Sequence, residues 1–197
     1  MTETPWRDIS VGPPPADTVA EGPEADPEQV ARAILLDALT GRARSRAELA
    51  ERLARKKVPP PLAERLLDRF TEVGLIDDAA FARLWIEQRV ASRGLAGRAL
   101  AVELRRKGVD DEIVREALAE RDTEGERGVA VELVRRKLRS MSRLDRDARV
   151  RRLVGMLGRK GYSPGLAYSV VRQVLAEDAE EGTTGTDPFE AGPPPVD

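Results

Sequence analysis

Apolar side chains recur at helical spacing in three segments of the chain, and the three segments share one pattern. In each, apolar residues four positions apart lie on both sides of a five-residue step that carries an Arg-Lys pair. The aligned apolar positions are Leu49, Leu53, Val58, Leu62 and Leu66, then Leu100, Leu104, Val109, Ile113 and Ala117, then Leu153, Leu157, Tyr162, Leu166 and Val170. The segments are offset by 51 and 53 residues. This spacing predicts two amphipathic helices joined by a short basic turn, repeated three times.

A further amphipathic segment precedes each helix pair. These segments carry Ala31, Leu35, Ala38 and Leu39, then Phe81, Leu84 and Trp85, then Ala130, Leu133, Val134 and Leu138. We therefore predict three three-helix units, at residues 28–76, 77–126 and 127–175. No stretch alternates between apolar and polar residues as a strand does, so the predicted fold class is all-α. A unit of about 50 residues is marginally stable alone, so the three tandem three-helix repeats are expected to form an elongated, curved array.

The two ends of the chain differ from this body in composition. Residues 1–27 hold six acidic residues, one basic residue and a run of three prolines, and residues 176–197 hold seven acidic residues, no basic residue and a second run of three prolines. Both ends have few large apolar side chains, so burial cannot offset the entropy lost on ordering them. We predict a disordered acidic tail at each end.

Residues at the predicted helix ends have the chemistry of caps. Ser45 opens a Ser-x-x-Glu capping box, in which a hydroxyl and a carboxylate each satisfy a backbone amide. Asp77 is a predicted N-cap of the helix that follows it. Gly108 and Gly161 occupy the same place in the basic turns of the second and third units, where a helix commonly ends in the left-handed conformation. Lys57 stands at the equivalent place in the first unit.

The composition excludes most enzyme classes. The chain has no Cys and no His, which removes thiolate nucleophiles, the usual general base and the commonest metal ligand. Asp77 and Asp78 are adjacent, but capping and the helix dipole explain both without a metal. Gly155, Gly158 and Gly161 are spaced like part of a nucleotide-binding loop, yet no strand precedes them and no Lys-Ser or Lys-Thr follows. We therefore expect no catalytic activity, no cofactor and no metal.

The chain shows no sign of a membrane segment. No apolar run approaches the ~20 residues that a membrane-spanning helix needs, and the acidic N-terminus lacks the charged and apolar regions of a signal peptide. We expect a cytoplasmic monomer.

The formal net charge of −2 conceals an uneven distribution. The first unit holds 10 basic and 7 acidic residues, the second 9 and 12, and the third 13 and 3, so their net charges are +3, −3 and +10. Basic residues at helix C-termini favour the dipole, and a charged surface keeps a helical protein soluble, but neither explains the surplus in the third unit. We interpret that surplus as a surface that contacts phosphates of DNA. Arg149 and Arg152, one turn apart, are expected to point into solvent together. The predicted contact residues are Arg135, Arg136, Lys137, Arg139, Arg149, Arg152, Arg159 and Lys160.

Four segments resemble motifs of the RecX family of recombinase regulators, at residues 39–49, 74–82, 103–109 and 157–163, and the resemblance covers about residues 28–175. It departs from the family pattern at Lys57, which stands where Gly is expected, and at Tyr162, which stands where Phe is commoner. The resemblance implies a protein that binds RecA, alone or as a filament on single-stranded DNA, and inhibits its ATP hydrolysis and strand exchange in DNA repair and the SOS response. Under this interpretation the basic turns of the first two units are candidate RecA contacts, namely Arg55, Lys56, Arg105, Arg106 and Lys107.

Two other functions are compatible with the same sequence. Helix pairs with short turns and basic residues also occur in regulators that bind double-stranded DNA, although a threefold repeat offers no unique recognition helix. An adaptor scaffold of the solenoid kind, binding only protein, is the other alternative. A footprint on a defined palindrome without an effect on a recombinase favours the first, and indifference to DNA favours the second. The sequence leaves open how a filament is inhibited and whether single- or double-stranded DNA is preferred.

Overall fold

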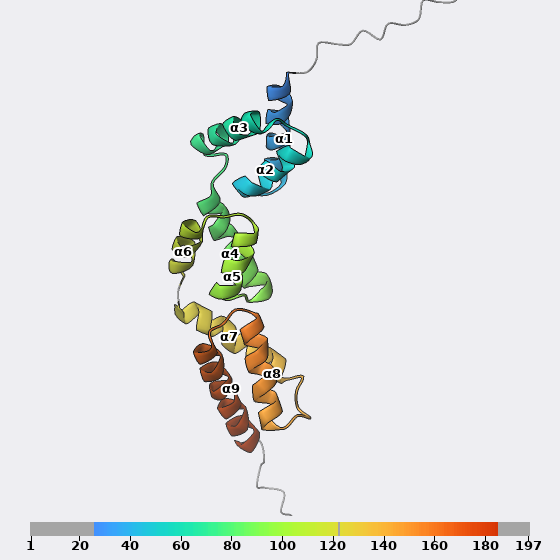
Figure 1. Ribbon diagram of the computed structural model, residues 1–197. Helices are drawn as coiled ribbons and strands as arrows, with labels where there is room; N and C mark the ends of the chain where they lie inside the picture. The colour runs from blue at the N-terminus through green and yellow to red at the C-terminus, as the bar shows by residue number, and fades with distance from the viewer. Residues whose placement is uncertain (1–25, 122, 185–197) are drawn as a thin grey trace, which may run out of the picture.

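The computed structural model describes residues 26–121 and 123–184, and within these ranges the chain forms nine α-helices and no strand. The first unit contains α1 (Pro27–Gly41), α2 (Arg46–Arg55) and α3 (Pro60–Glu72). The second contains α4 (Asp78–Arg93), α5 (Gly97–Arg106) and α6 (Asp111–Ala119). The third contains α7 (Thr123–Leu138), α8 (Arg146–Arg159) and α9 (Pro164–Thr184). The predicted all-α fold of three three-helix units is confirmed (Figure 1).

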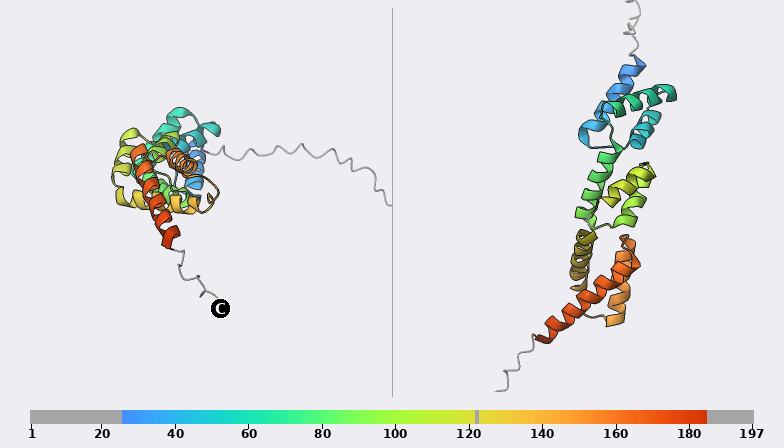
Figure 2. Two further views of the ribbon diagram at one scale, coloured as in Figure 1. Left: turned by 90° about the horizontal axis from the view of Figure 1, so that it is seen from below. Right: turned by 90° about the vertical axis from the view of Figure 1, so that its left-hand side faces the viewer.

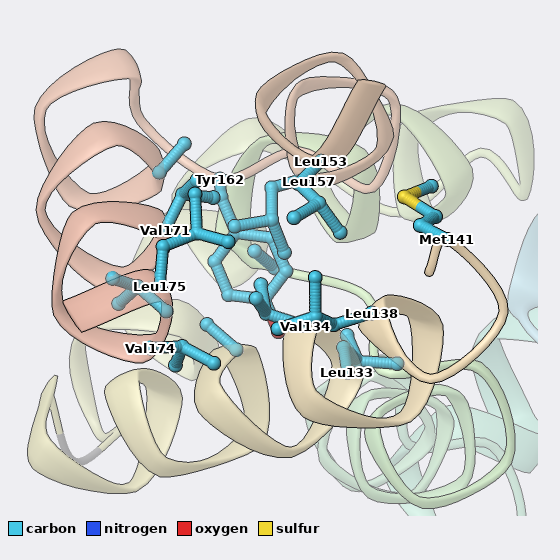
Figure 3. Close-up of a cluster of buried hydrophobic side chains, with 14 residues drawn as sticks. Leu133, Val134, Leu138, Met141, Leu153, Leu157, Tyr162, Val171, Val174 and Leu175 are labelled. Atoms are coloured by element: carbon cyan, nitrogen blue, oxygen red, sulfur yellow. The ribbon is translucent and has the colours of Figure 1, made fainter. Parts of the chain in front are cut away.

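Each unit has a hydrophobic core of its own. At the centre of each core lie the two leucines of its middle helix, which are fully buried: Leu49 and Leu53, Leu100 and Leu104, and Leu153 and Leu157. Figure 3 shows the third core, where side chains of α7, α8 and α9 converge. Burying one leucine stabilises a fold by roughly 1.5–3 kcal/mol. The leucines are the aligned positions of the repeat, so the spacing in the sequence places each core correctly.

The three units follow one another along an elongated array, with the first and third units at opposite ends (Figures 1 and 2). The helix pairs that pack extensively all lie within one unit. The predicted elongated arrangement is therefore confirmed, and the contacts that join successive units come from turns and helix ends.

The basic turn of the second unit packs against the N-terminus of α2 in the first. The hydroxyl of Ser45 donates a hydrogen bond to the backbone oxygen of Lys107 at 2.6 Å, and the ammonium of Lys107 forms an ion pair with Glu48, also at 2.6 Å. A Cβ added to Gly108 would lie 2.3 Å from the Cβ of Ala47. Glycine is required there by this close approach as well as by a φ of +72°.

The basic turn of the third unit makes the equivalent contact with the N-terminus of α5 in the second. The backbone amide of Ala96 donates to the backbone oxygen of Lys160 at 2.8 Å. A Cβ on Gly161, whose φ is +91°, would lie 2.4 Å from the backbone nitrogen of Ala99. The two junctions therefore share one arrangement, in which the basic turn of one unit packs against the N-terminus of the middle helix in the preceding unit.

Tyr162 strengthens the second junction. Its hydroxyl donates to the backbone oxygen of Gly94 at 3.2 Å, and the residue is only 3% exposed. Burial, aided by the charge of Glu126 and opposed by that of Arg121, raises the pKa of Tyr162 to about 12. The phenol therefore keeps its proton throughout the neutral range.

Lys57, which replaces the glycine in the first unit, has the same left-handed backbone with a φ of +60°. Its side chain is exposed, and among the described residues no unit precedes the first one for this turn to pack against. The close approach that demands glycine at Gly108 and Gly161 does not arise here, so a residue with a Cβ is tolerated at the cost of backbone strain alone.

The two adjacent aspartates at the start of α4 have different roles. Asp77 accepts a hydrogen bond from the amide of Ala80 at 2.8 Å, which confirms it as the N-cap. Asp78 accepts from the backbone amide of Arg46 at 2.8 Å and so satisfies the first turn of α2 in the neighbouring unit. Burial is the main reason that the pKa of Asp78 is raised. The expectation that Asp78 serves only its own helix is thus incomplete, because it also joins the first two units.

The helices overlap the predicted tails at both ends. α9 continues to Thr184, so residues 176–184 are helical and the boundary at 175 was wrong. α1 begins at Pro27, inside the predicted tail of residues 1–27. The disorder predicted for residues 1–25 and 185–197 lies outside the described residues. Glu177 and Asp178, which fall within the predicted acidic tail, lie on this extension and pair with arginines of α7 and α8.

Candidate nucleic-acid interface

Basic side chains of the third unit gather in two hollows that adjoin the connection between α7 and α8, residues 139–145. The first, which we call the open hollow, has a volume of about 470 Å³ and is lined by Lys137, Ser140, Met141, Arg151, Arg152, Met156 and Arg159. The second, which we call the acid-lined hollow, has a volume of about 590 Å³ and is lined by Arg135, Leu138, Arg139, Ser142, Arg149, Val174, Glu177 and Asp178. Six of the eight predicted contact residues therefore fall into two groups with different chemistry, whereas Arg136 and Lys160 line neither hollow.

The open hollow is lined by four basic side chains and no acidic one. Leu153 and Leu157 turn one face of α8 into the core, which leaves Arg152 and Arg159 exposed on one side of the helix two turns apart. None of the four basic side chains pairs with an acid among the described residues.

The arginines of the acid-lined hollow are largely neutralised. Arg135 pairs with Glu177 of α9 at 2.9 Å and with Glu132 at 3.3 Å. Hydrogen bonds from Gln173 and from Arg135 lower the pKa of Glu177, and the bond to Glu177 raises the pKa of Arg135. Both members of the pair are therefore charged at neutral pH. Arg139 is exposed at the rim of the same hollow.

Arg149 corrects the prediction that it points into solvent beside Arg152. Its guanidinium donates to the backbone oxygens of Leu144 and Ser142, both at 2.9 Å, and lies 3.6 Å from Asp178. Its side chain is 23% exposed, whereas Arg152 is exposed. Arg149 therefore holds the connection between α7 and α8 in place.

Lys160 lies at the junction between units rather than on the predicted surface. Its ammonium donates to the backbone oxygen of Arg93 in the second unit. Burial lowers the pKa of Lys160, and the nearby charges of Arg136 and Arg93 lower it further. Arg136 itself remains exposed.

The candidate RecA contacts in the first two units are dispersed among several roles. Arg55 pairs with Glu51 at 3.6 Å, and Arg105 pairs with Asp111 at 2.6 Å. Lys107 is part of the first junction. The remaining two, Lys56 and Arg106, are exposed.

Two features were missed by the sequence reasoning. Arg151 lines the open hollow but was not in the predicted set, although its position beside Arg152 was a usable signal. Trp85 of α4 lies beneath the guanidinium of Arg89, 4.0 Å from the ring centroid, and its indole N–H donates to Glu103 at 3.0 Å. The ammonium of Lys107 lies 4.9 Å from the same ring. The four-residue spacing of Trp85 and Arg89 on α4 was a usable signal, but no local pattern joins them to Glu103 and Lys107, which packing of the second unit brings to the ring.

Other kinds of site find no support in the described ranges. Residues 26–121 and 123–184 contain no group of three or more acidic side chains placed to hold a metal ion. Among the helices described, none is both long and apolar enough to span a bilayer.

Family models match all three units. The models described as the first, second and third three-helix domains of RecX match residues 31–70, 77–118 and 126–171, respectively. The order and spacing of the matches agree with the three cores of the structure.

Relatives of similar length are named regulatory protein RecX. One from Streptomyces coelicolor is 54% identical over 159 residues, which is 81% of this chain and 85% of the relative. One from Thermobifida fusca is 48% identical over 163 residues, covering 81% of this chain and 88% of the relative.

Two solved structures have the same fold. A crystal structure of RecX from Lactobacillus salivarius aligns with a TM-score of 0.72 at 18% identity, covering 77% of this chain and 99% of that one. A second crystal structure, of a regulatory protein RecX, aligns with a TM-score of 0.69 at 22% identity, covering 76% and 73%. At these identities the likeness concerns the fold alone.

Proposed function

The chain belongs to the RecX family of regulatory proteins, and from this membership we propose that it binds the RecA recombinase and its filament on single-stranded DNA. In this proposal the bound protein inhibits the ATP hydrolysis and strand exchange of RecA, and so acts in DNA repair and the SOS response. The elongated array supports the proposal, because it offers an extended surface that can lie along a filament.

The nucleic-acid part of this function is assigned to the open hollow. Its four basic side chains, Lys137, Arg151, Arg152 and Arg159, are not neutralised by acids among the described residues, and this is the observation that carries the assignment. Each contact between such a side chain and a phosphate releases counterions from the nucleic acid, which favours binding without reading sequence.

The proposed regulation requires no reaction catalysed by this chain. Cys and His are absent from the sequence, and the two carboxylates that line the acid-lined hollow, Glu177 and Asp178, are ion-paired to arginines. The chain acts in this proposal through binding free energy alone.

The assignment is tested by reversing charges in two units. Arg152→Glu with Arg159→Glu is expected to weaken binding to a single-stranded oligonucleotide and to lower the magnitude of the logarithmic salt slope by about 1.4, since each contact contributes roughly 0.7. The matched control is Arg105→Glu with Arg106→Glu, which makes the same charge change on exposed residues of the acidic second unit. An equal loss of binding and slope from both pairs would contradict the assignment to the open hollow.

The same measurements separate the alternatives. Preferential binding to one double-stranded palindrome, without an effect on RecA, would replace this function with that of a transcriptional regulator. Binding to RecA with no affinity for any nucleic acid would instead identify a protein-only adaptor.

A further inference from the structure

The acid-lined hollow contains three arginines and two acids that come from a different helix. Arg135 and Arg139 belong to the end of α7 and the residue after it, and Arg149 belongs to α8, whereas Glu177 and Asp178 project from the last turns of α9. We propose that this hollow is a second binding site for the phosphates of a nucleic-acid strand, which the strand enters by displacing the carboxylates of Glu177 and Asp178 from the arginines. The inference rests on the proposed contact between nucleic acid and the open hollow.

The position of the hollow supports a continuous path for one strand. Ser140 and Met141 line the open hollow, while Arg139 and Ser142, their neighbours in the chain, line the acid-lined hollow. The two hollows therefore adjoin the same short connection. A strand seated in the open hollow passes directly over this connection toward Arg139, which carries no ion pair among the described residues.

The carboxylates occupy the places that phosphate oxygens would take. Arg135 holds Glu177 at 2.9 Å, and Arg149 lies 3.6 Å from Asp178. A guanidinium donates to carboxylate and phosphate oxygens in the same geometry. A phosphodiester chain brings several such groups at fixed spacing, so one strand can replace both carboxylates together.

The acids can leave without unfolding the helix that carries them. The side chains of Arg135, Glu177 and Asp178 are 49%, 37% and 50% exposed, and ion pairs this exposed contribute little to stability. α9 is fixed on the core by its buried residues Val174 and Leu175. A rotation of the acidic side chains therefore opens the hollow while the backbone of α9 stays in place.

Glu177 has a second partner that can hold it after displacement. The amide of Gln173, one turn earlier on α9, donates to its carboxylate at 2.9 Å. The amide of Gln173 is in turn held by Arg127, which donates to its oxygen at 2.7 Å. This chain of polar contacts keeps Glu177 hydrogen-bonded on its own helix when Arg135 turns toward a phosphate.

The proposal predicts that neutralising the acid exposes the site. In the full-length chain, Glu177→Gln is expected to tighten binding of a labelled single-stranded oligonucleotide by about two- to five-fold, as measured by fluorescence anisotropy at low salt. Asp178→Asn is a second variant with the same expectation. The control is Asp147→Asn, which removes one negative charge from an exposed residue of the same unit that has no ion pair among the described residues.

A double-mutant cycle separates local displacement from a general effect of charge. If Glu177 blocks Arg135 directly, the gain from Glu177→Gln disappears when Arg135→Gln is also present. A gain that persists without Arg135, or that Asp147→Asn reproduces, would overturn the proposal, because long-range repulsion explains both.

The remaining outcomes distinguish this inference from the function on which it rests. If Arg152→Glu with Arg159→Glu weakens binding while neither Glu177→Gln nor Asp178→Asn changes it, the acid-lined hollow is no phosphate site and the open hollow stands. If neither the wild type nor any variant binds the oligonucleotide, both proposals fail. If the Glu177→Gln variant binds a polyglutamate peptide of equal charge more tightly than the oligonucleotide, the hollow is a site for an acidic protein segment, and the proposal is wrong. Circular dichroism of each variant confirms that the helices are retained.

Discussion

Gly161→Ala is expected to break the contact between the second and third units. The substitution places a Cβ 2.4 Å from the backbone nitrogen of Ala99 and 2.7 Å from its Cβ. Backbone cannot yield as the end of a flexible side chain does, so the turn must withdraw from the N-terminus of α5. Withdrawal also breaks the hydrogen bond between the amide of Ala96 and the backbone oxygen of Lys160.

The size of the effect follows from three contributions. A residue with a Cβ in the left-handed backbone conformation lowers the free energy of unfolding by about 1–2 kcal/mol. Overpacking adds about 1–3 kcal/mol, and loss of the hydrogen bond adds about 0.5–1.5 kcal/mol. Gly161→Ala is therefore expected to lower the free energy of unfolding by about 2.5–6.5 kcal/mol, or to uncouple the third unit from the other two.

Two matched variants isolate the contribution of the junction. Gly74→Ala has the same backbone requirement, with a φ of +72°, but a Cβ there meets nothing within 4 Å, so it is expected to cost only about 1–2 kcal/mol. Lys57→Gly removes left-handed strain where no described unit packs, and is expected to be neutral or slightly stabilising.

The assay is urea unfolding followed by the helical circular dichroism signal. The wild type is expected to unfold with coupled units, and Gly161→Ala to show either a much lower midpoint or a separate transition for the third unit. Equal losses from Gly161→Ala and Gly74→Ala, each with a single transition, would refute the reasoning that this turn joins the units.

Three further changes test other contacts. The pKa of Tyr162 is about 12 in the folded chain, so its phenol stays protonated there after the unfolded chain has begun to lose this proton at about pH 10. The wild type should therefore lose ~1 kcal/mol of unfolding free energy per pH unit above about pH 10. Tyr162→Phe should lack this dependence when urea unfolding is compared at about pH 9 and about pH 11. Ser45→Ala removes both a helix cap and the bond to Lys107 and should cost about 1–3 kcal/mol of unfolding free energy, more than Ser163→Ala, which removes a cap alone. Burial raises the pKa of Glu48, but its ion pair with Lys107 contributes to a net lowering. The charged carboxylate therefore stabilises the fold above the pKa that Glu48 has in the unfolded chain, and this stabilisation is lost as the pH falls through the pKa in the folded chain. In acid titrations followed by circular dichroism, Glu48→Gln should lack this contribution to the loss of stability at low pH.

Much of the fold could be predicted because it depends on local patterns. The apolar spacing around Leu49, Leu100 and Leu153 identifies the three cores, since burial of one helix face requires that spacing wherever a helix lies on a core. The role of Asp77 as an N-cap could be predicted equally well, because a cap accepts a hydrogen bond from an amide only two or three residues away.

The contacts between units could not be predicted in the same way. Ser45 bonds to a residue 62 positions later, and Asp78 to one 32 positions earlier. Short polar side chains of this kind have an adequate local role as caps, so the sequence offers no reason to seek a distant one. The sequence shows that Lys57 stands where the other two units have glycine. It does not show the reason, which is that only the glycines of the second and third units lie close to a neighbouring unit.

The candidate surface stays a prediction, and the structure changes which of its cations are available for contact. Charge counted along the chain identifies the third unit, but it does not say which cations are neutralised. Arg135 and Arg149 are paired with acids of α9 that lie within the predicted tail, whereas Arg152 and Arg159 are unpaired among the described residues. Which arginines are paired depends on how far α9 continues. Helix propensity and apolar spacing do not predict its length beyond Leu175, its last buried residue.

The most direct test of the proposed function is the DNA-dependent ATPase of RecA from the same organism, measured while the full-length chain is added at substoichiometric ratios. The proposal predicts that the wild type inhibits hydrolysis and that Arg152→Glu with Arg159→Glu inhibits less at equal concentration, with its helical signal unchanged. ATP hydrolysis that continues at its full rate in the presence of saturating, folded wild-type protein would contradict the proposal that this chain regulates RecA by binding its filament.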